Sequence, residues 1–288
     1  MGGTTQSHHY DTGDTPECEN ADWMSQIPDD TSLADLTIPG SHRSLSFYGG
    51  SMYQCQSWSL EQQLLAGIRF IDIRCRHYDN DLPLYYSFIF QSCHFKDVLE
   101  TTVEFLDKHD TEVVLVHLKD EYMPAFNDQS FQDTLLGFMS KYDEHRFWLK
   151  PDIPTVGDCR GKIVLIQEFP STVSMGLPYY KTFKLEDDSW VPTLLNMYSR
   201  WKKAEQNLDR ALKKEKAEGQ MFLTYCNGAG IAAYPYSVAS YINWYLAEYV
   251  KENQAALGII ALDFPGAGLI SDLIKTNHLV NTVTDRSV

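Results

Sequence analysis

Short apolar runs alternate with amphipathic stretches along most of this chain. Runs that fit buried strands cover residues 36–39, 68–75, 82–90, 112–118, 162–166, 221–226 and 257–263. Stretches with one apolar stripe at helical spacing cover residues 95–106, 131–142, 198–218 and 237–253. About seven or eight strands alternating with helices over roughly 250 residues predict a single α/β barrel rather than an open, doubly wound sheet.

Local signals mark the ends of smaller segments. Ser59 and Gln62 have the spacing of a capping box, and Gly67 is placed to end the short helix that follows. Residues 1–26 are rich in Thr, Asp, Gly and Ser, so we predict a flexible N-terminal arm there. One barrel domain is expected over residues 27–288. Residues 171–196 lack a clear period, which predicts long loops with one strand at most.

Composition and charge narrow the classes of function. The formal net charge of −15 repels nucleic acid, so no nucleic-acid partner is expected. Six cysteines are spread along the chain without a Cys-x-x-Cys pair, which argues against a zinc site and favours reduced thiols. The first 20 residues lack the apolar segment of a signal peptide, so a cytoplasmic location is expected. No window is apolar for long enough to span a membrane.

Charged residues gather where the predicted strands end. The turn at Pro39-Gly40 places His42 at the rim of a sheet, because proline cannot donate to the strand ladder. Strand alternation places Asp72 and Arg74 on one face. Other strand ends carry Lys119, Glu121 and Asp263. A histidine beside an acid, with basic groups to neutralise a phosphoryl group, suits base-assisted attack on a phosphodiester. Taken singly, His42 could instead cap a neighbouring element, and Asp72 and Arg74 could form a local ion pair.

Six runs resemble the X domain of phosphatidylinositol-specific phospholipases C, in the family's order. They are Ile38-Pro-Gly-Ser-His-Arg-Ser44, Gly67-Ile-Arg-Phe-Ile-Asp-Ile-Arg74, Val113-Val-Leu-Val-His-Leu-Lys-Asp-Glu121, Gly161-Lys-Ile-Val-Leu-Ile166, Tyr236-Ser-Val-Ala-Ser-Tyr-Ile-Asn243 and Gly258-Ile-Ile-Ala-Leu-Asp-Phe264. The resemblance implies a distorted (β/α)8 TIM-type barrel. It also implies cleavage of phosphatidylinositol, or of a GPI-type inositol phospholipid, to diacylglycerol and a cyclic inositol phosphate.

The resemblance also implies roles for individual residues. His42 would be the general base that activates the inositol 2-hydroxyl, and Asp263 would orient it. Arg74 would hold the phosphate, with Asp72 supporting this network. Relatives that use calcium carry an acidic ligand where this chain has Arg74, so no metal and no other cofactor is expected.

The sequence departs from the family pattern at the general acid. Tyr86 stands where the family has a histidine, and the phenol is a weaker match to neutral pH. His94 is an alternative proton donor if its loop folds back over the barrel mouth. Two further departures are Arg43, in place of the acid that follows the base in bacterial enzymes, and Glu168, in place of a basic inositol contact. The expected substrate contacts are Arg43, Lys119, Glu121, Glu168 and Tyr236.

Two functions from different classes remain open at this point. The first is a metal-independent phosphodiesterase that works as a monomer and touches the membrane surface transiently. The second is a catalytically impaired protein of the same fold that binds an inositol-phosphate or lipid headgroup. Aromatic residues near a loop could form an interfacial patch in either case, namely Tyr234, Tyr236, Tyr241 and Trp244. Tyr241 and Trp244 lie inside a predicted helix and are expected to be core residues.

Overall fold

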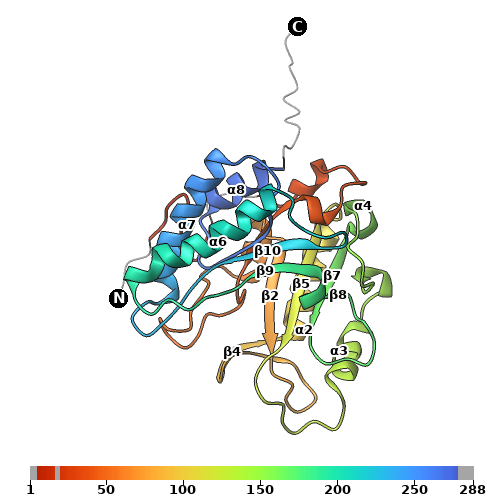
Figure 1. Ribbon diagram of the computed structural model, residues 1–288. Helices are drawn as coiled ribbons and strands as arrows, with labels where there is room; N and C mark the ends of the chain where they lie inside the picture. The colour runs from red at the N-terminus through yellow and green to blue at the C-terminus, as the bar shows by residue number, and fades with distance from the viewer. Residues whose placement is uncertain (1–4, 17–19, 278–288) are drawn as a thin grey trace.

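A computed structural model describes residues 5–16 and 20–277 of the chain. Its centre is a curled sheet in which each neighbouring pair of strands is parallel. The strands follow the spatial order β6 (Phe147–Trp148), β7 (Lys162–Glu168), β5 (Val113–Asp120), β2 (Phe70–Cys75), β1 (Thr37–Ser41), β11 (Gly258–Leu262), β10 (Met221–Cys226) and β9 (Phe183–Glu186). The predicted α/β barrel is thereby confirmed (Figure 1).

The barrel is distorted on one side. The short strand β8 (Leu177–Pro178) pairs with the edge of β7, and β9 pairs with β10. Within the described residues no ladder joins β8 to β9, and the one-turn helix α5 (Tyr179–Thr182) lies between them in the chain. Residues 171–196 therefore contain more regular structure than their sequence predicted, because pairing with existing sheet edges stabilises segments too short to show a period.

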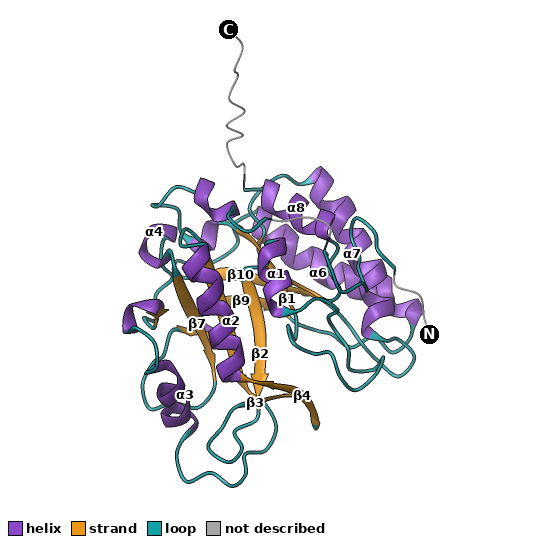
Figure 2. Ribbon diagram, turned by 180° about the vertical axis from the view of Figure 1, so that it is seen from behind, coloured by secondary structure: helices purple, strands orange, loops and turns teal. Residues whose placement is uncertain are grey.

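Helices cover the outside of the sheet. They are α1 (Leu60–Ala66), α2 (Phe95–Lys108), α3 (Phe131–Met139), α4 (Val156–Cys159), α6 (Met197–Leu212), α7 (Pro235–Glu252) and α8 (Ala267–Lys275). Figure 2 shows α1 and α2 in front of the strands, with the antiparallel hairpin of β3 (Pro83–Tyr86) and β4 (Ile89–His94) beyond the arrowhead of β2. No helix in the described ranges has the length and apolar character that crossing a bilayer requires.

The start of α1 follows its sequence signals. The Ser59 side chain accepts a hydrogen bond from the Gln62 backbone, and the Gln62 side chain accepts one from the Ser59 backbone. Gly67 ends the helix at φ 111°, a left-handed conformation that favours glycine. These contacts confirm the predicted capping box and helix end.

The predicted N-terminal arm is wrong for the described residues. Trp23 and Met24, in the 3-10 helix Trp23–Gln26, are buried, and the Trp23 indole donates to the Gly67 carbonyl at 3.1 Å. The Met24 backbone donates to the buried carboxylate of Glu112 at 3.0 Å. Nearer the N-terminus, Tyr10 is also buried and bridges to Pro265. A few apolar anchors therefore hold a segment whose overall composition predicted flexibility.

Candidate active site

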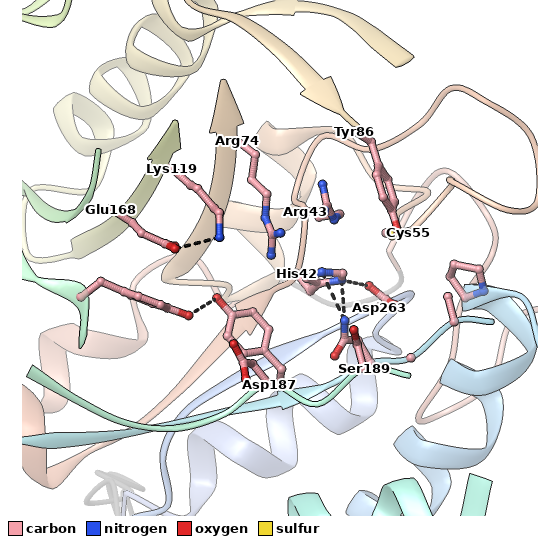
Figure 3. A pocket seen from close by; sticks show the side chains of 16 residues that line it. His42, Arg43, Cys55, Arg74, Tyr86, Lys119, Glu168, Asp187, Ser189 and Asp263 are labelled. Carbon is pink, nitrogen blue, oxygen red and sulfur yellow. Dashed lines mark hydrogen bonds and ion pairs between the residues drawn. The ribbon is translucent and has the colours of Figure 1, made fainter. Parts of the chain in front are cut away.

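The strand register brings His42 and Asp263 together. Ser41 at the end of β1 pairs with Leu262 at the end of β11, so the next residue of each strand lies at the same level of the barrel. His42 Nδ1 is 2.8 Å from Asp263 Oδ1, and both side chains are nearly fully buried (Figure 3). Because the carboxylate accepts a hydrogen bond from Nδ1–H, the lone pair of the neutral ring is on Nε2.

Two amides hold this pair in place. The Gln56 side chain donates to the carbonyls of His42 and Leu262 at 2.7 and 2.8 Å, which ties the two strand ends together. Asn227 follows the end of β10, where Cys226 pairs with Leu262. Its side-chain nitrogen lies 3.1 Å from His42 Nδ1 and 3.2 Å from Nε2, and both residues line the pocket. The base candidate is therefore fixed by three strands and an ordered loop.

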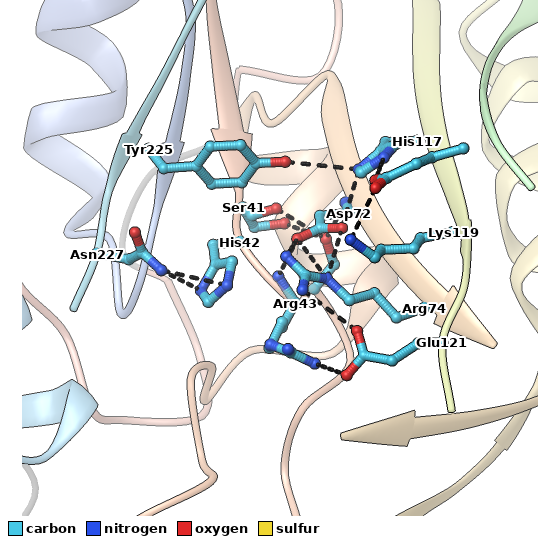
Figure 4. A network of polar contacts seen from close by, with 12 residues as sticks. Ser41, His42, Arg43, Asp72, Arg74, His117, Lys119, Glu121, Tyr225 and Asn227 are labelled. Carbon is cyan, nitrogen blue, oxygen red and sulfur yellow. Dashed lines mark hydrogen bonds and ion pairs between the residues drawn. The ribbon is translucent and has the colours of Figure 1, made fainter. Parts of the chain in front are cut away.

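Arg74 is held by two carboxylates. Its guanidinium donates to Asp72 Oδ2 at 2.9 Å and to Glu121 Oε2 at 3.2 Å, while part of the side chain faces the pocket (Figure 4). Burial lowers the pKa of Arg74, but Asp72 and Glu121 outweigh burial and hold it well above its ordinary value. Arg74 is therefore a fixed positive charge at the pocket wall.

A second histidine, His117, lies beside this group. Asp72 pairs with His117 across β2 and β5, and the Asp72 carboxylate contacts His117 Nδ1 at 3.0 Å. The other ring nitrogen contacts Glu168 at 2.9 Å, and Lys119 donates to the same carboxylate at 2.7 Å. These contacts join strands β2, β5 and β7 into one polar network.

The pKa shifts in this network favour its charged forms. Burial lowers the pKa of His117, but hydrogen bonds to Asp72 and Glu168 outweigh burial and raise it. Burial raises the pKa of Asp72, but Arg74 and His117 hold it well below its usual range. Burial also raises the pKa of Glu168, whereas hydrogen bonds from His117 and Lys119 bring it down to about 2. The two carboxylates thus favour the charged form of His117, and each of its ring nitrogens faces an acid.

Tyr86 reaches the pocket beside Arg43. The Arg43 guanidinium lies 3.6 Å from the centre of the Tyr86 ring and donates to Glu121 at 2.9 Å. Arg43 has a φ of 41°, and its backbone N–H donates to Asp72 at 3.1 Å. Burial raises the pKa of Tyr86 to about 12, against the opposing effect of Arg43. At neutral pH the phenol therefore keeps its proton and can donate it.

The structure brings most of the predicted residues to one pocket. Its wall includes His42, Arg43, Arg74, Tyr86, Lys119, Glu168 and Asp263. Asp72 and Glu121 lie behind this wall and contact it through Arg74 and Arg43.

Two residues considered for the site are absent from the pocket wall. Tyr236 is 38% exposed and follows Pro235, which does line the wall, so its contact with substrate stays a prediction. His94 pairs with Asp81 at 2.8 Å beside the β3–β4 hairpin, so its loop does not fold over the barrel mouth. Tyr241 and Trp244 are exposed, at 52% and 46%, so the expectation that they are core residues is wrong.

Sequence reasoning missed several residues of the site, and four of them show why. His117 shares a strand face with Lys119, a spacing of two that was available as a signal. Asn227 is a polar residue at a strand end, as Asp263 is. Tyr225 lies in an apolar strand, and Cys55 lies in a loop, and neither position carries a signal in the sequence. Both nevertheless line the pocket.

The comparisons with known proteins agree with this geometry. Residues 30–169 match the family model for the X domain of phosphatidylinositol-specific phospholipase C. The 1-phosphatidylinositol phosphodiesterase of Listeria monocytogenes is 31% identical, over 88% of this chain and 84% of that protein. The 1-phosphatidylinositol phosphodiesterase of Staphylococcus aureus (strain Newman) is 23% identical, over 96% of this chain and 100% of that protein.

A solved structure extends the likeness to the fold. The phosphatidylinositol-specific phospholipase C from Listeria monocytogenes superposes with a TM-score of 0.79 at 31% identity, covering 90% of this chain and 99% of that one. The fold and the site thus define an α/β barrel with a histidine-aspartate pair beside a fixed arginine. This chain belongs to the phosphatidylinositol-specific phospholipase C X-domain family.

Proposed function

We propose that this chain is a metal-independent phospholipase C that cleaves phosphatidylinositol or a GPI-type inositol phospholipid. The observation that carries the proposal is one pocket in which the His42–Asp263 pair faces the fixed charge of Arg74. Relatives at 31% and 23% identity are named 1-phosphatidylinositol phosphodiesterases, which supports the same substrate class here.

In the first step, His42 Nε2 takes the proton of the inositol 2-hydroxyl, and that oxygen attacks the phosphorus. Asp263 accepts the Nδ1 hydrogen bond throughout, so it stabilises the imidazolium that forms. The bond from phosphorus to the diacylglycerol oxygen breaks as the new bond forms. The products are a cyclic inositol phosphate and diacylglycerol.

Arg74 supplies the positive charge for the transition state. Its guanidinium is already oriented by Asp72 and Glu121, so little reorganisation is needed when negative charge develops on the phosphoryl oxygens. Both carboxylates are occupied by arginine side chains, because Glu121 also binds Arg43. This arrangement supports the proposed reaction without a metal ion.

Tyr86 would return a proton to the leaving oxygen. An alcohol is less acidic than a phenol, so a tyrosine with a pKa of about 12 can still protonate an alkoxide. Arg43, stacked on the ring, favours the phenolate that this transfer leaves behind. We expect the reaction to be slower than with a histidine donor.

The opposite wall of the pocket suits a hydroxyl-rich ring. Lys119 donates a hydrogen bond to Glu168 at 2.7 Å, so a cationic donor and an anionic acceptor lie side by side on this wall. Asp187 and Ser189 add further polar groups. Carboxylates accept hydrogen bonds from sugar hydroxyls. We assign this wall to the inositol ring.

Loops that line the pocket also carry exposed apolar residues. Residues 187–191 and 228–235 run side by side, with Trp190 bridged to Ala229. On the same loops Trp190 and Ile231 are 59% and 81% exposed. We propose that this rim touches the membrane transiently when a lipid headgroup enters. The groups that the proposed reaction uses lie in one pocket of this chain, so the proposed monomeric enzyme needs no residue from a second copy.

The test is release of cyclic inositol phosphate from phosphatidylinositol vesicles in excess chelator. The native chain should produce it, and His42→Ala should lower the rate by about 10² to 10⁴-fold. Tyr86→His should raise the rate, whereas Tyr86→Phe should lower it. Headgroup binding without turnover in the native chain would contradict the proposal and favour the headgroup-binding function.

A further inference from the structure

Cys55 lies in the wall of the pocket beside the base. It belongs to the loop before α1, and only 1% of it is exposed. Its backbone N–H donates to Ser46 at 3.0 Å, and its carbonyl accepts from Phe264 at 3.0 Å. Because Phe264 follows Asp263 directly, these bonds fix the thiol next to the carboxylate that orients His42. Nothing in the proposed reaction uses this thiol.

His42, Cys55 and Asp263 form a compact set of donors. One nitrogen, one sulfur and one oxygen lie within 4.8 Å of one another, and all three residues are buried. It is the one group of this kind in the part of the chain that the structure describes. All three residues also line the pocket, so an ion entering from the mouth reaches them without unfolding the barrel (Figure 3).

One oxygen of the Asp263 carboxylate is available to bind a ligand. Its Oδ1 atom accepts from His42, but Oδ2 is buried without a hydrogen-bond donor of its own. A buried carboxylate oxygen without a donor costs free energy. Burial and the Asp263 carboxylate hold the pKa of the adjacent Cys55 thiol well above its usual range, so a bound cation must displace the thiol proton. Such a cation would also contact the Asp263 oxygen that lacks a hydrogen-bond donor.

The geometry points to an inhibitory site for a thiophilic divalent cation of the Zn²⁺ class at His42, Cys55 and Asp263. Zinc prefers thiolate, imidazole and carboxylate ligands, and three protein ligands leave its fourth position open to water from the pocket. On binding, the Cys55 thiol loses its proton to solvent and a sulfur–zinc bond replaces the sulfur–hydrogen bond. The thiolate and the Asp263 carboxylate then balance the two charges of the ion, which limits repulsion by Arg43 and Arg74.

A metal ion bound at this site would prevent His42 from acting as the general base. If Nε2 coordinates, the lone pair that would accept the inositol proton is taken. If Nδ1 coordinates, the hydrogen bond to Asp263 is lost and the ring no longer has its working tautomer. This consequence rests on the proposed role of His42, whereas metal binding itself does not.

Cobalt gives a readout of the site that is independent of catalysis. Co²⁺ added to the metal-free native chain should produce the near-ultraviolet charge-transfer band of a cobalt–thiolate bond, and Zn²⁺ should abolish it by displacement. Cys55→Ser should lack the band. The control is Cys93→Ser, because Cys93 is a partly exposed thiol 3.8 Å from Asp97 and outside the pocket. This control should keep the band.

Measurements of phosphodiesterase activity then test whether metal binding inhibits the enzyme. Zn²⁺ should inhibit the native chain and Cys93→Ser, with recovery on adding chelator. Cys55→Ser should need more than about 100-fold more Zn²⁺ for equal inhibition relative to its own metal-free rate. Absence of the band in the native chain, its loss in Cys93→Ser alone, or equal zinc sensitivity of Cys55→Ser would overturn the site. If the chain shows no phosphodiesterase activity, the cobalt band still decides whether the metal binds.

Discussion

The barrel contains two histidine-carboxylate groups, and they differ in how many nitrogens of the imidazole ring contact an acid. In the β2–β5–β7 half, His117 contacts Asp72 at 3.0 Å and Glu168 at 2.9 Å, so both ring nitrogens are occupied by acids. In the β1–β11–β10 half, His42 contacts one acid among the described residues, Asp263 at Nδ1, and its other polar neighbour is the side-chain amide of Asn227.

The difference separates a structural ion cluster from a base. A histidine between two carboxylates stays protonated and holds strands together, but it has no lone pair with which to accept a proton. A histidine with one carboxylate has a fixed tautomer and a lone pair on the far nitrogen. Residue type and burial are the same in both halves, so the number of acidic partners decides the role.

The largest expected effect comes from replacing each histidine with asparagine. His42→Asn should lower the rate of cyclic inositol phosphate release by about 10² to 10⁴-fold. Its effect on stability should be smaller than that of His117→Asn, because only one carboxylate, Asp263, loses its histidine partner. His117→Asn should instead lower the free energy of unfolding by about 3–5 kcal/mol, since it leaves Asp72 and Glu168 without their shared cation.

Urea unfolding and rates per folded molecule measure the two effects on the same pair of variants. Arg74 remains in place in His117→Asn, so this variant should keep more activity than His42→Asn at a temperature where both are folded. If the two variants lost stability and activity equally, the proposed division between the halves would be wrong.

A second, smaller effect is the dependence of stability on pH. The folded pKa of Glu168 is about 2, below its ordinary value of 4.5, so its contribution is present above pH 4.5 and is lost as pH falls toward 2. His117 has a raised pKa, so its contribution is present below its ordinary value of 6.5 and is lost as pH rises through the folded pKa.

Unfolding free energies measured from pH 2 to 9 check both signs. Glu168→Gln should flatten the acid side of the profile, because the titrating carboxylate is gone. An unchanged acid side in Glu168→Gln would mean that the ion cluster does not set the stability of this half.

The smallest effect concerns the rim beside His42. Trp190→Ser should weaken binding to phosphatidylinositol vesicles about 10-fold, as expected for partial loss of one large apolar side chain from a membrane contact. Cleavage of a soluble, short-chain substrate should stay close to the native rate. Trp244→Ser is the matched control, because Trp244 is 46% exposed but lies on α7 outside the pocket-lining loops. Vesicle sedimentation of both variants decides the point, and equal losses would place the contact elsewhere.

Much of the site could be predicted because strand ends carry their chemistry in sequence. His42, Asp72, Arg74, Lys119 and Asp263 each follow or end an apolar run, and parallel strands bring their carboxyl ends to one face. Alternation with a period of two assigned Asp72 and Arg74 to the same side. Local sequence also determined the α1 capping box, whose two partners are three residues apart.

Only the tertiary structure decided which of these residues touch. The register that places Asp72 beside His117, and Lys119 beside Glu168, depends on how the strands slide past one another, and a single strand carries no record of this. Cys55 shows the limit most clearly. Its position in the sequence carries no signal, yet backbone bonds to Ser46 and Phe264 hold this thiol beside His42 and Asp263, and Asp263 is far away in the chain.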